Sequence, residues 1–104
     1  MIESHPAIDL KPNEWAEVIG LLRRHVPTLE VWAFGSRVKG TAKPYSDLDL
    51  ALITTTPLPL EQRAILIEAF DQSNLPINVD IVDWSNITEA FRKIIMQHKV
   101  VIQA

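Results

Sequence analysis

Apolar residues along this chain alternate between helical spacing and short runs, which predicts the order helix, strand, strand, helix, strand, helix. The first helical pattern follows Pro12, a residue that suits the first turn of a helix, and it stops before Pro27. Short apolar runs at residues 30–34, 48–53 and 77–82 predict the three strands.

Residues 61–72 predict the second helix, but its apolar positions extend around too much of the helix for one that lies on the surface. These positions are Ala64, Ile65, Leu66, Ile67, Ala69 and Phe70. We therefore expect most of them to be buried. A last helix is expected after Ser85 or Asn86, one of which would cap it, and residues 100–102 predict a final extended segment. The expected fold class is α+β, with a small mixed β-sheet and helices packed on one face.

Polar residues interrupt the apolar pattern most sharply at residues 35–49, which read GSRVKGTAKPYSDLD. Asp47 and Asp49 are spaced so that they share one face of a strand, although strands are depleted in aspartate. Two like charges this close disfavour joint ionisation unless a cation lies between them. The pair therefore indicates a site for a divalent cation.

Asp80 is a third carboxylate within an apolar strand, and it would join the other two if the second and third strands are neighbours. Ligation by oxygen alone selects hard cations such as Mg²⁺, and two such ions can clamp the attacking and leaving oxygens of a displacement at phosphorus. We expect Asp47 and Asp49 to bridge two Mg²⁺ ions. Asp80 would hold the metal on the acceptor's side or take the proton from the attacking hydroxyl. Asp83 lies at the strand end, where aspartate commonly begins a turn.

The turn at Gly35 and Ser36 supplies a complementary anion site. Glycine lets the backbone approach a phosphate closely, and the N–H groups of a turn that opens a helical segment bind anions. The Ser36 hydroxyl and the Arg37 guanidinium are further candidate phosphate donors, and Lys39 and Lys43 carry positive charge on the same loop.

Composition limits the remaining choices. The 104 residues suit one domain, residues 1–104, and the absence of cysteine excludes disulfides, thiolate metal sites and cysteine nucleophiles. Neither a signal peptide nor an apolar stretch of about 18 residues is present, so we expect a cytoplasmic protein without membrane contact. A formal net charge of −3 gives no overall attraction for nucleic acid, and no direct nucleic-acid binding is expected.

The glycine–serine turn, ten further residues and then Asp-Leu-Asp resemble the G-S-x10-D-x-D signature of the DNA polymerase β-like nucleotidyltransferases. The wider pattern, GSRVKG…SDLDLAL…INVDIVD, is similar to the minimal nucleotidyltransferases (MNT proteins), which are the antitoxins of HEPN/MNT toxin–antitoxin pairs. The similarity spans residues 14–102 and implies the nucleotidyltransferase (polymerase β-like) fold.

The resemblance also implies a role for each motif. In that family the glycine–serine turn binds nucleotide phosphates, and the aspartates bind Mg²⁺ and carry catalysis. The implied nucleotide-binding residues are Gly35, Ser36, Arg37 and Lys39, and the implied catalytic and metal-binding residues are Asp47, Asp49 and Asp80. Many relatives carry arginine where this chain has Lys39, which keeps the charge but loses the bidentate geometry.

MNT proteins are reported to transfer AMP from ATP to a tyrosine of the partner toxin, which silences it. The resemblance therefore implies a Mg²⁺-dependent protein adenylyltransferase with ATP as substrate and a HEPN-type toxin as partner. Two alternatives stay open: a non-catalytic antitoxin that neutralises a HEPN ribonuclease by binding, and nucleotidyl transfer to a small molecule or RNA. A chain of this length offers no extra domain to grip the acceptor, which favours a protein partner.

Overall fold

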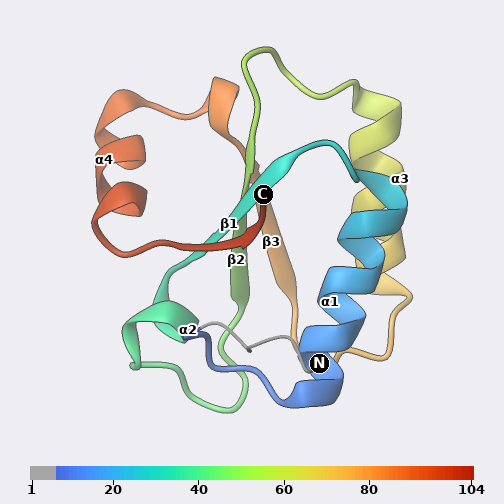
Figure 1. Ribbon diagram of the computed structural model, residues 1–104, viewed down its shortest axis with the longest axis vertical. Coiled ribbons are helices and arrows are strands. Elements are labelled where there is room, and N and C mark those ends of the chain that lie inside the picture. The colour runs from blue at the N-terminus through green and yellow to red at the C-terminus, as the bar shows by residue number, and fades with distance from the viewer. Residues whose placement is uncertain (1–6) are drawn as a thin grey trace.

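The computed structural model describes residues 7–104, and its element order contains the expected one, with a short helix, a 3₁₀ turn and a last strand in addition (Figure 1). The helices are α1 (Pro12–His25), α2 (Ser36–Lys39), α3 (Leu60–Asp71) and α4 (Glu89–Gln97), with one 3₁₀ turn, η1 (Trp84–Asn86). The strands are β1 (Glu30–Phe34), β2 (Leu48–Ile53), β3 (Val79–Asp83) and β4 (Val100–Gln103). The final extended segment expected from the sequence is therefore an additional strand, β4.

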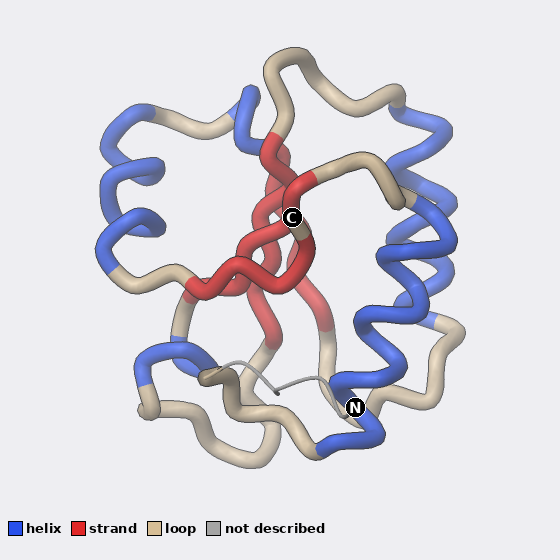
Figure 2. Tube along the Cα trace, in the orientation of Figure 1, coloured by secondary structure: helices blue, strands red, loops and turns tan. Residues whose placement is uncertain are grey.

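The four strands form one mixed sheet in the order β3-β2-β1-β4, which lies between the helices (Figure 2). β1 pairs antiparallel with both β2 and β4, whereas β2 and β3 run parallel. Parallel neighbours need a crossover connection, and α3 supplies it. The α+β class and the mixed sheet predicted from the sequence are confirmed.

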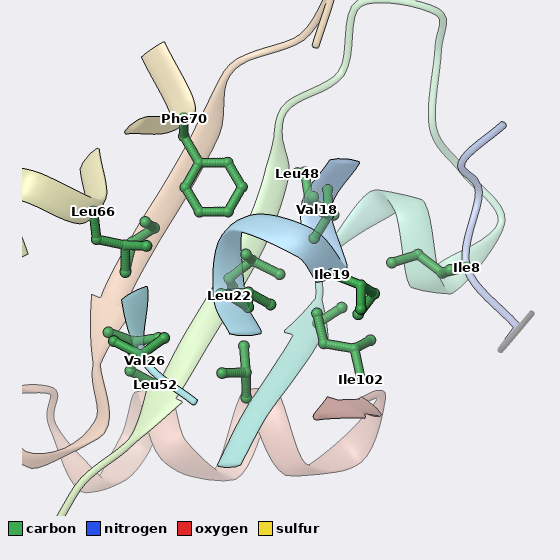
Figure 3. Packing of buried hydrophobic residues seen from close by; sticks show 14 of the residues in the cluster. Ile8, Val18, Ile19, Leu22, Val26, Leu48, Leu52, Leu66, Phe70 and Ile102 are labelled. Carbon is green, nitrogen blue, oxygen red and sulfur yellow. The ribbon is translucent and has the colours of Figure 1, made fainter. Parts of the chain in front are cut away.

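The larger core lies between the sheet and the pair of helices α1 and α3, where apolar side chains from both layers interlock (Figure 3). The fully buried members from the strands and helices include Val31, Leu48, Leu50, Leu52, Val18, Leu22 and Leu66. On β2 these are alternate residues, so the intervening positions of the same strand face the other side of the sheet.

A second core covers that other side, beneath α4. Trp32 and Trp84 meet edge to face with ring centroids 5.0 Å apart, and Phe34 meets Phe91 of α4 at 5.8 Å. Ile95 of α4 is buried in the same cluster. The expectation that the helices pack on one face therefore needs one correction: α1 and α3 cover one face and α4 covers the opposite one (Figure 1).

The expected burial of α3 is wrong in part. Leu66 and Phe70 are buried, but Ile65 is 49% exposed and Ile67 is 37% exposed. Because α3 lies beside α1 and contacts the sheet through one side only, the apolar residues on its other sides remain exposed to solvent.

The cap of the last helix also differs from the prediction. Thr88 is the N-cap of α4, and its Oγ1 accepts a hydrogen bond from the N–H of Phe91 at 3.1 Å. Ser85 and Asn86 lie instead in η1, which Asp83 caps.

Within residues 7–104, no helix is long and apolar enough to cross a bilayer.

Candidate active site

Asp49 and Asp80 lie side by side on neighbouring strands. The parallel pairing of β2 and β3 places the two residues directly in register. Both side chains lie on the face of the sheet that α4 covers. The strand neighbours of Asp49 and the neighbour of Asp80, Ile81, belong to the larger core on the opposite face, and successive residues of a strand point to opposite faces. The sequence hypothesis required the second and third strands to be neighbours, and the structure confirms that they are.

Asp47 joins this pair from the loop before β2. Burial, the charge of Asp47 and a hydrogen bond with the Asp47 side chain all raise the pKa of Asp80. Burial, together with the charges of Asp80 and Asp47, raises the pKa of Asp49 to about 6. The three carboxylates thus converge at the ends of β2 and β3, and each additional negative charge there favours binding of a proton or a cation.

Gly35 brings the glycine–serine turn against the same carboxylates. Phe34 ends β1 directly opposite Asp49, and Gly35 follows with a φ of 82°, a value that favours glycine. A Cβ atom added to Gly35 would overlap Oδ2 of Asp49. Only glycine therefore leaves the carboxylate of Asp49 in its place beside the turn.

The short helix α2 begins at this turn and leaves two N–H groups outside its own hydrogen bonds. The N–H groups of Val38 and Lys39 both donate to the carbonyl of Gly35 at 3.1 Å. Those of Ser36 and Arg37 precede these first helical bonds, so α2 does not use them. Turn N–H groups that a helix does not use are suited, beside a glycine, to a phosphate oxygen.

Arg37 makes contacts that differ from those expected of a phosphate ligand. Its side chain is buried, and its guanidinium donates to three backbone carbonyls: Ser46 at 2.9 Å from Nε, Asp9 at 2.7 Å and Pro44 at 3.1 Å. Lys39, by contrast, is exposed on α2 next to the turn. Lys43, on the same segment, is exposed as well, so both lysines are accessible to solvent while the Arg37 guanidinium is bound to the loop before β2.

The carboxylates fit Mg²⁺ by their chemistry but do not form a complete cage. Among residues 7–104, no group of three or more histidine, cysteine, aspartate or glutamate side chains is arranged to hold a metal ion. Mg²⁺ usually binds one or two carboxylates and completes its shell with substrate phosphates and water. Three carboxylates, two of which have pKa values raised first by burial and then by their mutual repulsion, match that mode of binding.

Sequence reasoning missed one contribution to the site, because it comes from a backbone atom. The N–H of Leu48 donates to the carbonyl of Asn78 at 2.9 Å, and this bond fixes the start of β2 against the start of β3. The sequence offered no signal for this bond, because every residue carries a backbone carbonyl.

In-register carboxylates beside the turn at Gly35, on one face of a small mixed sheet, match the arrangement expected of the nucleotidyltransferases. The chain belongs to the nucleotidyltransferase domain family, which matches it over residues 16–102.

Similar proteins agree with that family. A Haemophilus influenzae protein described as a probable protein adenylyltransferase, MntA, is 52% identical over 100 residues, which are 96% of this chain and 88% of the relative. The resemblance to the minimal nucleotidyltransferases is thereby confirmed. An Enterococcus faecalis spectinomycin 9-adenylyltransferase is 35% identical over 83 residues, 78% of this chain and 31% of that enzyme.

A solved structure agrees as well. A crystal structure of a toxin–antitoxin complex with AMP-PNP contains a chain that superposes with a TM-score of 0.72 at 26% identity. The superposition covers 86% of this chain and 73% of that one. The fold expected from the resemblance is therefore confirmed.

Proposed function

We propose that this protein transfers AMP from ATP to a hydroxyl group of a partner protein, and that the partner is the HEPN-type toxin of a toxin–antitoxin pair. The observation that carries the proposal is the in-register pair Asp49 and Asp80 beside Gly35. The adenylyltransferase name of the 52% identical relative supports AMP as the transferred group, and the toxin–antitoxin complex with AMP-PNP supports a toxin as the partner. We also propose a cytoplasmic location, as expected from the sequence.

The reaction is an in-line displacement at the α-phosphorus of ATP. A bond forms between the acceptor oxygen and this phosphorus, while the bond from the phosphorus to the oxygen it shares with the β-phosphate breaks. Pyrophosphate leaves with that electron pair, and the hydroxyl proton passes to the carboxylate of Asp80. Its raised pKa, caused first by burial and then by the charge of Asp47, makes Asp80 a better proton acceptor than an ordinary aspartate.

The glycine–serine turn binds the phosphates that leave. The N–H groups of Ser36 and Arg37 and the Ser36 hydroxyl are the donors of this turn, and Lys39 adds a positive charge from the exposed side of α2. Donors fixed in place before the reaction stabilise the charge that develops on pyrophosphate without reorganising.

Asp47 and Asp49 would hold Mg²⁺, with two ions expected, and Asp80 would be a further ligand if it does not act as the base. When bound, Mg²⁺ neutralises the negative charge of the triphosphate. The chain's own contribution is to hold the carboxylates in register and to keep the turn at Gly35 against Asp49.

The test is the intact mass of the HEPN toxin after incubation with this protein, ATP and MgCl₂. The toxin should gain the mass of one AMP group for each transfer, and EDTA should prevent the gain. Asp47→Asn combined with Asp49→Asn should abolish the transfer, whereas Asp71→Asn, the same change on the exposed end of α3, should leave it intact.

The same variants separate catalysis from docking. If transfer is the function, cells that carry the toxin should lose protection when Asp47 and Asp49 are both replaced by asparagine. Undiminished protection by that double variant would instead show that binding alone neutralises the toxin. A parent protein that modifies an aminoglycoside or an RNA end, and not the toxin, would assign a different acceptor.

A further inference from the structure

We infer that Arg37 is a positioning residue that holds Asp47 in place for nucleotide transfer, and that it is not a phosphate ligand. The inference rests on the proposed function for the identity of the reaction. It also replaces the role that the sequence pattern suggested for this arginine, which is that of a charged donor to the triphosphate.

The contacts of the guanidinium carry this inference. The Arg37 side chain is only 6% exposed, and its three nitrogens each donate to a backbone carbonyl. Two of these carbonyls, those of Pro44 and Ser46, belong to the loop of residues 41–46, and the third belongs to Asp9. A side chain buried in this way is directed into the loop, and each of its nitrogens already donates to a carbonyl.

The loop of residues 41–46 leads directly to the first catalytic carboxylate. Ser46 precedes Asp47, and the carbonyl of Ser46 accepts from Nε of Arg37 at 2.9 Å. On the other side of Asp47, the N–H of Leu48 donates to the carbonyl of Asn78 at 2.9 Å. The exposed Asp47 is therefore fixed by its two neighbours, one held by Arg37 and the other by β3.

Arg37 also ties the start of the described chain to the site. The N–H of Asp9 donates to the Arg37 carbonyl at 2.7 Å, and the Asp9 carbonyl accepts from the guanidinium at the same distance. Ile8 and Leu10, on either side, are buried in the larger core. The guanidinium thus connects a segment anchored in the core to the loop of residues 41–46.

Lysine cannot reproduce these contacts. Arginine presents five N–H donors in a rigid planar fork, whereas lysine carries its donors on a single ammonium at the end of a flexible chain. Arg37→Lys therefore keeps the charge and loses the geometry that reaches three separate carbonyls. This difference allows a positioning role to be distinguished from a phosphate contact.

The experiment compares the parent protein with Arg37→Lys and Arg37→Met, using ATP and the HEPN toxin as substrates. We expect both variants to lower kcat at least about tenfold, because small displacements of a catalytic group are costly, and to change KM for ATP by less than about twofold. Binding of AMP-PNP without toxin should be equally unaffected. Arg24→Lys, an exposed position at the end of α1, is the matched control and should behave as the parent does.

Hydrogen exchange provides a readout that does not depend on activity. The N–H groups of Lys43 and Ser46 are bonded within the loop of residues 41–46, to Ser46 Oγ and to the Lys43 carbonyl respectively. In both Arg37 variants these amides should exchange at least about tenfold faster, because the loop loses the guanidinium that holds it.

A phosphate contact would give the opposite set of results. Arg37→Met would then raise KM for ATP and weaken AMP-PNP binding, Arg37→Lys would restore most of the loss, and loop exchange would not change. That set of results overturns the inference. A parent protein that transfers nothing to the toxin refutes the proposed function instead, and the exchange and AMP-PNP measurements still decide whether Arg37 holds the loop or binds phosphate.

Discussion

Gly35 and Asp49 show how a single atom decides the geometry of this site. The positive φ at Gly35 turns the chain out of β1, and the missing Cβ makes room for a carboxylate oxygen. Glycine is thus required at this position for two reasons: the positive φ of the backbone, and the space that the carboxylate on the neighbouring strand needs.

Gly35→Ala should therefore abolish nucleotide transfer and lower the free energy of unfolding by about 3 kcal/mol, because it combines a backbone strain with an overlap. Gly40→Ala is the matched control: its φ is 78°, but a Cβ there would meet nothing within 4 Å. It should cost about 1–2 kcal/mol and keep activity. Urea denaturation and the toxin mass assay check both; equal effects of the two substitutions would contradict the role of the overlap.

The raised pKa of Asp49 predicts how stability depends on pH without divalent cations. Between pH 3.8 and about 6, the folded protein binds a proton at Asp49 that the unfolded chain has released, so stability falls as the pH rises through this window. The shift corresponds to roughly 3 kcal/mol, which solvent screening of this partly exposed side chain reduces to about 1 kcal/mol.

Asp49→Asn should accordingly raise the free energy of unfolding at pH 7 by about 1 kcal/mol, while abolishing transfer. It should also flatten the dependence of stability on pH between 4 and 6. Urea denaturation in EDTA at both ends of this range measures the effect. A variant less stable than the parent at pH 7 would contradict it, and Asp71→Asn controls for the loss of one surface charge.

The sequence predicted which aspartates meet at the site better than it predicted the contacts of Arg37. Aspartate is unusual within apolar strands, so the apolar neighbours of Asp49 and Asp80 in the sequence made these two residues recognisable as candidates. The partners of Arg37 are backbone carbonyls, which every residue carries, so nothing in the sequence indicates which of them a buried guanidinium will reach.

At the scale of whole elements, Asp83 anchors the exit of β3. It is 2% exposed and accepts hydrogen bonds from Thr54 Oγ1, from the N–H and hydroxyl of Ser85, and from the N–H of Leu58 at 2.7 Å. One carboxylate thereby joins β3 to η1 and to the connection between β2 and α3.

Asp83→Ala should lower the free energy of unfolding by about 2–4 kcal/mol, because several buried donors lose their acceptor. Burial raises the pKa of Asp83, but the hydrogen bonds from Ser85, Thr54 and Leu58 outweigh it and leave the pKa lowered. The contribution is therefore present above pH 3.8 and is lost as the pH falls through the lower folded value. Denaturation at pH 7 and pH 3 tests this, with exposed Asp71→Ala expected within about 0.5 kcal/mol of the parent.

Because only one side of α3 is buried, replacing a buried and an exposed apolar residue of this helix should affect stability differently. Leu66→Ala should cost about 2–5 kcal/mol, because the side chain is fully buried, whereas Ile65→Ala should cost less than about 1 kcal/mol. Thermal or urea denaturation of the two variants distinguishes them. Equal losses would mean that α3 is buried on both sides, as the sequence first suggested.

The periodicity predicted the positions of α1, α3 and α4 along the chain but not which side of α3 meets the core. An α-helix with apolar residues all around, such as α3, gives no direction to its buried face. The cap of α4 shows a similar limit, because Ser85, Asn86 and Thr88 are all good cap residues. Ser85 and Asn86 lie in the turn η1, so Thr88 is the N-cap.

At the scale of the whole molecule, the sheet has two cores, and its central strand β1 depends on β4 at one edge. Ile102 of β4 is buried in the larger core, and Gln103 Nε2 donates at 2.8 Å to the carbonyls of both Val26 and Leu29. Lys99, just before β4, lies 3.7 Å from the ring centroid of Trp32. The sequence predicted this segment as extended but could not assign its partner strand.

Ending the chain at His98 should consequently cost about 3 kcal/mol or more, because it removes a buried isoleucine and uncovers the edge of β1. Removing only Ala104, which is exposed and follows the strand, is the control and should change little. Urea denaturation together with light scattering measures stability and association. Full stability of the shorter chain would contradict the role given to β4.

The alternation along β3 also restricts where this chain can gain or lose residues. Asp80 faces the carboxylate cluster and Asp83 the opposite layer, so their spacing of three positions is set by the pleat. An insertion or deletion of one residue between them would turn one of the two away from its partners.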